Sequence, residues 1–286
     1  MCDRLSLSRR FHCHSHNSSD GLQIMIDARP VRVASKQILT LPHNKRALAA
    51  AIALEWDLLV SAQQALKQHY IPLTSLTSRA VDIRNADAQG NTRIRTDLVK
   101  MLMRYLSTDT LLCWAPEKSI HDPAAKAGLD MANNSTQSLR ARQKEVAEPI
   151  IAFLKTHIFP GVDINPTLGE ETIMPIPQPK MTQEIIRGWI TGLPAFELAA
   201  LERGVLASKS LMVAARLLVE WSKEFKHLPK NNSNGQNQRF GIAQAAEASS
   251  VEVTWQTNMW GEVEDTHDVE KEDMARQLGS VILLVS

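Results

Sequence analysis

The spacing of apolar residues changes at Pro42, and this change limits the folds open to the chain. Before Pro42, apolar residues alternate in short runs, which are Ile24 with Ile26, Val31 with Val33, and the segment 38–41. Alternation predicts strands, because successive side chains of a strand point to opposite faces. After Pro42, apolar residues recur every three or four positions, as in helices that pack on one face. The two patterns predict an α+β protein with a small β-meander near its start.

The helical pattern after Pro42 is interrupted by segments rich in proline, glycine and asparagine. Helices are expected at about 44–59, 72–83, 94–105, 138–155, 182–190, 194–204, 205–225 and 241–260. The short apolar run at 110–114 is expected to be a strand, and 115–137 a surface insertion. We therefore predict a small α/β N-terminal domain over 21–80 and a larger, mainly helical C-terminal domain over 81–286. Residues 1–20 are expected to form an arm outside both domains.

Composition excludes several classes of partner. Lys and Arg number 32 against 31 Asp and Glu, giving a formal charge of +1. Proteins that bind nucleic acid usually carry a basic excess, so no nucleic-acid partner is expected. No apolar run approaches the roughly 18–20 residues that span a bilayer, so no membrane insertion is expected. The three cysteines lack the spacing of a zinc site, which favours a reducing compartment.

The two ends of the chain differ in charge. Residues 1–20 are rich in Arg and Ser and have no apolar core, which is typical of a mitochondrial transit peptide. An arm without a targeting role is the alternative. The arm contains four potential metal ligands, His12, Cys13, His14 and His16, but adjacent ligands form a poor cage, and no metal is expected. Residues 262–273 hold seven acids and one lysine, which indicates a solvated helix end or a surface that steers a basic partner.

The common motifs of nucleotide-binding proteins and hydrolases do not occur. There is no Gly-x4-Gly-Lys-Ser/Thr, no Gly-x-Gly-x-x-Gly after a strand, no His-Glu-x-x-His and no Gly-x-Ser-x-Gly. We therefore expect no nucleotide, no cofactor and no catalytic residue. The alternative is a mitochondrial matrix hydrolase or transferase whose site has no local signature and uses an acid such as Asp82 or Glu252.

The helix expected at 241–260 carries two adjacent lines of side chains. The apolar line is Val251, Trp255 and Met259, and the neighbouring line is Glu252, Gln256 and Trp260, with Ser249 beside Glu252. One interpretation is an amphipathic helix whose boundary glutamate pairs with a nearby arginine. The other is a recognition face, in which a carboxylate beside aromatic residues anchors a protein partner.

Three further residues are interpreted as structural. Trp56 lies on the apolar stripe of its helix, where an indole usually packs into the core. Arg79 and Asp82 are three residues apart on a helix, and this spacing predicts a local ion pair.

Six blocks, taken in order, give the chain a resemblance to one family. They are DARPVR (27–32), IALEWD (52–57), PLTSLTSRAVD (72–82), RYLSTDTLLC (104–113), KSL (209–211) and EVTWQ (252–256), the last followed by WGE (260–262) and HD (267–268). The family that they resemble is the assembly chaperones that act on the alpha subunit of the F1 sector of mitochondrial ATP synthase.

This resemblance implies a binding protein of the mitochondrial matrix. Its partner would be the unassembled alpha subunit, held until it joins beta subunits, and no nucleotide would be required. Such a subunit exposes interface surface that would otherwise aggregate. We expect Glu252, Gln256, Trp260 and Ser249 to contact the partner. Arg29 and Asp109, which lie within the blocks, are expected to have structural roles.

Overall fold

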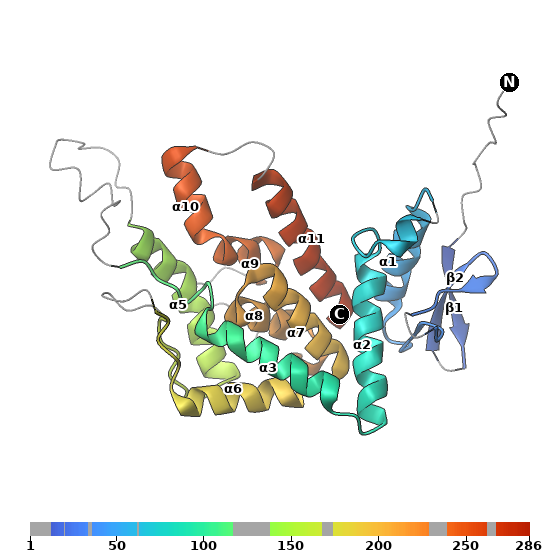
Figure 1. Ribbon diagram of the computed structural model, residues 1–286, viewed down its shortest axis with the longest axis horizontal. Helices are drawn as coiled ribbons and strands as arrows, with labels where there is room; N and C mark the ends of the chain where they lie inside the picture. The colour runs from blue at the N-terminus through green and yellow to red at the C-terminus, as the bar shows by residue number, and fades with distance from the viewer. Residues whose placement is uncertain are drawn as a thin grey trace.

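A small antiparallel sheet stands beside a larger helical body, so the predicted α+β class is confirmed (Figure 1). The computed structural model describes residues 13–19, 21–33, 36–61, 63–116, 138–167, 174–228, 239–261 and 267–286. In this part of the chain, every element after the sheet is helical. The sheet contacts the body through the first helix, which packs on two of its strands.

The sheet is organised around one strand. Its members are β1 (Cys13–Ser18), β2 (Gly21–Ile26), β3 (Arg29–Pro30) and β4 (Thr40–Leu41), and β2 pairs antiparallel with each of the others. Gly21 has φ 147°, and a Cβ there would lie 2.2 Å from the carbonyl oxygen of Leu41. Only glycine fits this close approach. The buried Leu22 and Ile24 of β2 face the core.

The strand β1 corrects the prediction of an arm over the whole of 1–20. Residues 13–18 pair with β2 along their full length, from Cys13 opposite Ile26 to Ser18 opposite Gly21. Their sequence, CHSHNS, has no apolar alternation, because the described side chains of this edge strand are exposed or only half-buried. The alternation of apolar and polar residues that marks a strand is therefore absent here, although backbone pairing does not require it.

Ten α-helices and two short 3-10 helices follow in the described chain. They are α1 (Arg46–Asp57), η1 (Gln64–Leu66), α2 (Pro72–Ala88), α3 (Arg93–Ser107), α5 (Leu139–His157), α6 (Lys180–Gly192), α7 (Ala195–Ser208), α8 (Leu211–Trp221), η2 (Lys223–Phe225), α9 (Ile242–Ser249), α10 (Val251–Trp260) and α11 (His267–Val285). The domain boundary predicted near residue 80 falls within α2, which packs on both α7 and α11.

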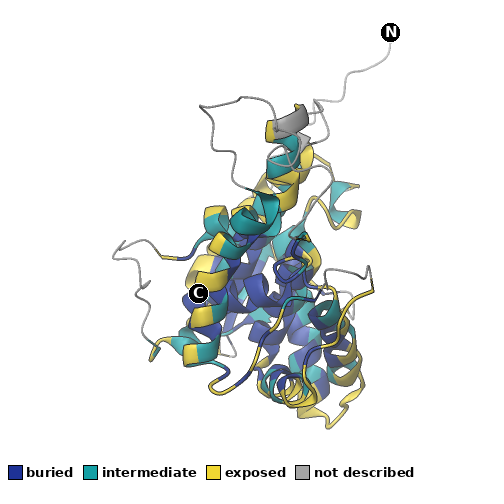
Figure 2. Ribbon diagram, turned by 90° about the vertical axis from the view of Figure 1, so that its left-hand side faces the viewer, coloured by how far each residue is buried: buried dark blue, intermediate teal, exposed yellow. Residues whose placement is uncertain are grey.

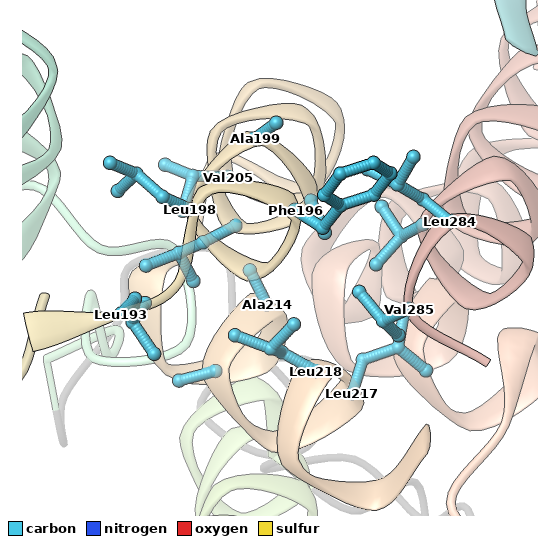
Figure 3. Close-up of a cluster of buried hydrophobic side chains, with 14 of the residues drawn as sticks. Leu193, Phe196, Leu198, Ala199, Val205, Ala214, Leu217, Leu218, Leu284 and Val285 are labelled. Atoms are coloured by element: carbon cyan, nitrogen blue, oxygen red, sulfur yellow. The ribbon is translucent and has the colours of Figure 1, made fainter. Parts of the chain in front are cut away.

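The core lies where α7, α8 and α11 meet (Figures 2 and 3). Every residue of α8 from Leu211 to Glu220 is buried. Gly204 was expected to end a helix, but it lies inside α7, where a Cβ would be 3.0 Å from Cβ of Ala214. The missing side chain lets α7 and α8 approach closely. The helix ends instead at Ser208, before the left-handed Lys209 (φ 56°).

A buried lysine joins the start of α1 to the end of α11. The ammonium of Lys45 donates hydrogen bonds to the carbonyl oxygens of Leu284 (2.8 Å) and Ser286 (3.2 Å). Burial lowers the pKa of Lys45 to about 8, because a low-dielectric site disfavours the charged form. The carbonyls at the end of a helix lack intrahelical partners, so this lysine acts as a cap from outside the helix.

Two further predicted elements differ from the structure. The segment 110–114 is a turn and not a strand, because Leu112 and Cys113 both donate their backbone N–H to the carbonyl of Asp109. The helix expected at 241–260 is broken at Ser250 into α9 and α10. The hydroxyls of Ser249 and Ser250 donate to the carbonyls four residues earlier, which competes with the backbone ladder and bends a helix.

Candidate functional site

The helix α10 stands out from the helical body and buries little of its surface (Figure 1). Of its side chains that the structure describes, none is buried; Glu252, Val253, Thr254 and Asn258 are exposed, and the others are half-buried. It packs against α5. A helix held so lightly contributes little to the core, so its apolar residues remain accessible to a partner.

Glu252 is an exposed residue in the first turn of α10. Its Oε1 accepts a hydrogen bond from the Nε2 of Gln256 at 3.1 Å, one helical turn further on. Among the residues that the structure describes, no cation lies within ion-pair distance of this carboxylate. The arginine partner of the first interpretation is therefore not found there. The negative charge of Glu252 is oriented by a neutral amide but not neutralised.

A cavity of about 180 Å³ lies beneath the first turn of α10. It is lined by Thr110, Leu111, Cys113, Gln143, Ala248, Ser249, Val251, Glu252 and Val253. The break at Ser250 places Ser249 on α9 and Glu252 on α10, yet both still line this cavity. Two of the four residues expected to contact a partner are thereby brought together.

Of the other two expected partner residues, the structure describes the side chain of Gln256 but not that of Trp260. Gln256 is half-buried on α10 and holds the carboxylate of Glu252. The side chain of Trp260 lies outside the described part of the structure, so its expected contact stays a prediction. The predicted C-cap Gly261 has φ 89° and donates its N–H to the carbonyl of Thr257. This left-handed conformation ends α10.

Asp109 precedes Thr110 and Leu111, two residues that line this cavity. It is fully buried and accepts hydrogen bonds from the Ser210 hydroxyl (2.5 Å) and from the backbone N–H groups of Met212 and Leu111 (3.0 Å each). Burial raises the pKa of Asp109 to about 6, and these hydrogen bonds oppose the rise. The carboxyl thereby ties the turn after α3 to the start of α8.

The cavity also contains a thiol. The Sγ of Cys113 lies 3.1 Å from the Oγ1 of Thr167. Burial raises the pKa of Cys113, and the nearby charges of Asp109 and Glu252 raise it further. The thiol is therefore held protonated, which makes it a poor nucleophile.

Trp56 is half-buried against the core, and its Nε1 donates to the Oγ1 of Thr74 at 2.8 Å. Its neighbour Glu55 was not identified from the sequence. The Glu55 carboxylate is buried and accepts from the N–H groups of Leu73 (2.7 Å) and Thr74 (2.9 Å) and from the Thr74 hydroxyl (2.6 Å). Burial raises the pKa of Glu55. In the sequence, the sign of this cap on the start of α2 was an acidic residue placed among the apolar residues of α1.

Arg79 corrects the predicted ion pair. Its guanidinium contacts Glu202 of α7 in a two-point arrangement, with Nε 3.0 Å from Oε2 and a second nitrogen 3.2 Å from Oε1, and does not pair with Asp82. A fork of this kind favours one planar carboxylate, which α7 supplies. Asp82 lines the same shallow hollow between α2 and α7. Arg29 is exposed in β3, opposite Ile26.

A buried network that was not expected from the sequence positions α9 and α10. Arg216 and Glu220 of α8 form an ion pair at 2.6 Å, and both are almost fully buried. Arg239, just before α9, reaches the other Glu220 oxygen at 3.3 Å and the Glu220 carbonyl at 3.1 Å. The indole of Trp221 donates to the carbonyl of Phe240 at 2.9 Å. The chain that leads into α9 is thereby fixed to α8.

Neither a cluster of metal ligands nor a membrane-spanning helix is found among the described residues. No group of three or more His, Cys, Asp or Glu among them is arranged to hold a metal ion. His14 and His16 are exposed on β1, whereas His12 lies outside the described chain. None of the helices that the structure describes has the length and apolar character needed to cross a bilayer.

Comparison with known proteins gives consistent matches. The sequence model of the family described as ATP12 chaperone protein matches residues 9–155. "Protein atp12, mitochondrial" from Schizosaccharomyces pombe is 31% identical over 261 residues, covering 91% of this chain and 76% of that protein. "Protein ATP12, mitochondrial" from Saccharomyces cerevisiae is 27% identical over 277 residues, covering 90% and 76%.

The fold also has a solved counterpart. The crystal structure of Atp12 from Paracoccus denitrificans superimposes with a TM-score of 0.65 at 22% identity and covers 96% of each chain. At this identity the match shows a shared fold. Together with the sequence matches, it confirms the resemblance carried by the six blocks.

Proposed function

This chain belongs to the family of ATP12 chaperone proteins, which makes it a chaperone of ATP synthase assembly, and from this premise we propose which client it binds. The proposed client is the unassembled alpha subunit of the F1 sector, held until beta subunits join it. The proposed compartment is the mitochondrial matrix, in keeping with the mitochondrial names of the two yeast relatives. The proposed mode of action is binding alone, without nucleotide, cofactor or catalytic step.

The observation that carries this proposal is the exposed helix α10. Its side chains combine an oriented, uncompensated carboxylate with half-buried apolar residues such as Val251 and Trp255. A client that must later be released is better bound by a mixed polar and apolar contact than by a dry one. On the alpha subunit, a cation would neutralise the carboxylate of Glu252, or a hydrogen-bond donor would bind it.

The enzyme alternative would require an acid with a raised pKa that faces a substrate. Asp109 has such a pKa, but its carboxyl is fully buried and already accepts three hydrogen bonds from its own chain. The raised pKa values of Glu55 and Glu197 likewise arise at buried positions, where each carboxyl accepts hydrogen bonds from its own chain. These acids stabilise the fold, which favours binding over catalysis.

A binding titration tests the proposal. Immobilised alpha subunit is titrated with the wild-type protein, with Glu252→Lys, and with Glu184→Lys, which makes the same charge change at an exposed position on α6. We expect wild type and Glu184→Lys to bind equally. Glu252→Lys should bind at least about tenfold more weakly, because like charges then meet across the interface.

The same titration with beta subunit and with ATP completes the test. We expect no saturable binding to beta subunit alone and no change of affinity with millimolar ATP. If wild-type protein fails to bind alpha subunit, the proposed client is wrong. If Glu252→Lys binds like wild type, Glu252 does not take part in the contact.

A further inference from the structure

Five large apolar side chains remain exposed where α1 ends and α2 begins. They are Leu54 (59% exposed), Leu58 (72%), Val60 (80%), Leu66 (85%) and Tyr70 (43%), and we call them the α1–α2 apolar surface. Single exposed apolar residues are ordinary in soluble proteins, but a group of this size within seventeen residues is not. Such a group indicates a surface that a partner covers.

The exposure of this surface is fixed by contacts beneath it. Glu55, buried next to the exposed Leu54, accepts three hydrogen bonds from Leu73 and Thr74 at the start of α2. Trp56 donates to the Thr74 hydroxyl from the same turn of α1. These bonds join the two ends of the connection 58–71, in which Leu58, Val60 and Leu66 stay exposed.

A further contact attaches the connection to the helical body. Arg276 of α11 donates to the carbonyl oxygen of His69 at 2.8 Å. The connection therefore lies against α11, which stands between it and α10 in Figure 1.

The charge of the connection indicates what kind of partner fits. From 54 to 70 the sequence is LEWDLLVSAQQALKQHY, in which Glu55 is buried, and Asp57 and Lys67 are the exposed residues with a formal charge. Surfaces that lie on anionic membranes carry many Lys and Arg beside their apolar residues, and this one does not. Protein interfaces are depleted in charge at their centre and have a polar rim, which Gln63 and Gln68 supply here.

We propose that the α1–α2 apolar surface binds an uncharged, apolar segment of the client subunit, one that a neighbouring subunit covers in the finished assembly. This inference rests on the proposed function and adds a second contact to the one at α10. A second copy of this chain fits this surface less well than the client does. A stable dimer buries about 20–30 residues a side, far more than this surface offers alone.

Two matched double variants test the inference. Leu58→Ser with Leu66→Ser removes apolar area from the surface, and Met174→Ser with Met181→Ser removes it from exposed positions near the start of α6. Both pairs are solvent-exposed, so both variants should melt like wild type. In titrations with purified alpha subunit, the first should bind about tenfold more weakly, and the second should bind like wild type.

The remaining outcomes separate this inference from the proposed function. If wild type and both variants bind alpha subunit equally, the surface inference is wrong and the proposed function stands. If wild type does not bind alpha subunit, the proposed function is wrong, and this inference is overturned with it. Sedimentation, and flotation with phosphatidylcholine–cardiolipin vesicles, complete the test. A wild-type dimer or vesicle binding that the Leu58/Leu66 variant loses would overturn the inference in favour of a second copy or a lipid surface.

Discussion

Helices α8 and α10 carry the same local pattern and are used in opposite ways. Each has a glutamate and a polar partner four residues apart: Arg216 with Glu220 on α8, and Glu252 with Gln256 on α10. On α8 the pair is buried and closes at 2.6 Å, whereas on α10 Glu252 is exposed and the two side chains meet at 3.1 Å. The first pair stabilises the fold, whereas the second pair remains available to contact a partner.

The difference teaches that burial, and not spacing, decides what a polar pair does. A buried pair must satisfy itself, because an unpaired charge in the core costs several kcal/mol. An exposed pair contributes only a few tenths of a kcal/mol to its helix, so its chemistry is free for another molecule. Each prediction below tests one side of this contrast.

Glu220→Ala should have the largest effect. It leaves the guanidinium of Arg216 buried without its carboxylate and also releases Arg239. We expect a loss of about 3–5 kcal/mol in the free energy of unfolding, measured by urea denaturation. The double variant Arg216→Met/Glu220→Leu should recover much of that loss. A loss below about 1 kcal/mol for Glu220→Ala would mean that the buried pair on α8 contributes no more to stability than the exposed pair on α10.

Asp109→Asn should change the pH dependence of stability. In the folded chain the pKa of Asp109 is about 6 against an ordinary 3.8, so between these values the folded state keeps a proton that the unfolded state releases. The resulting contribution to stability is complete below about pH 4 and is lost as pH rises through 6, by about 3 kcal/mol in total. The side-chain amide of the variant does not titrate in this range. Urea unfolding from pH 4 to 7.5 should show a steeper decline in wild type than in the variant, which keeps the raised pKa values of Glu55 and Glu197 and therefore declines as well. Parallel profiles would contradict the prediction.

Trp56→Phe should have an intermediate effect. The ring is half-buried and phenylalanine keeps most of its packing, but the hydrogen bond to Thr74 is lost. We expect about 1 kcal/mol of destabilisation by thermal or urea unfolding. Thr74→Val, which removes the acceptor and also one donor to Glu55, should cost more. If Trp56→Phe cost more than Thr74→Val, the indole itself would be the main contact.

Glu252→Lys should have the smallest effect on folding. Its side chain is exposed and its hydrogen-bond partner is a neutral amide, so the free energy of unfolding should stay within about 0.5 kcal/mol of wild type. Differential scanning calorimetry of the two proteins is sufficient to measure this. A clear drop in melting temperature would show that α10 stabilises the fold as α8 does.

Much of the fold follows from the spacing of apolar residues. Ile24 in the sheet, and Leu98 and Leu102 in α3, are buried as their periodicity predicts. The helix α11 was not predicted, although Met274, Leu278 and Ile282 recur every four residues, because the acidic run before them was interpreted as a solvated helix end or tail, or as a surface that steers a partner. β1 gave no periodic signal at all.

The candidate site is less predictable for a physical reason. Spacing alone cannot distinguish the pair on α8 from the pair on α10, because both are four residues apart. The partner of Arg79 is 123 residues away, and the donors that meet Asp109 come from α8 as well as from its own turn. Such contacts depend on how helices cross, which no local pattern records. Glu252, Gln256 and Trp260 were singled out by residue type and not by burial, and their contact with a partner stays a prediction.

The tie from Lys45 has a consequence for the time course of synthesis. Its acceptor on Leu284 lies 239 residues further along the chain. At about 5–20 residues per second, a ribosome needs on the order of 10–50 s to supply that carbonyl after Lys45 has been made. The same interval precedes the arrival of Leu278 and Val281, which α7 and α8 need to close their core. During this interval the core of this assembly chaperone is itself incomplete, and factors that cover nascent apolar surface have their longest opportunity to act on it.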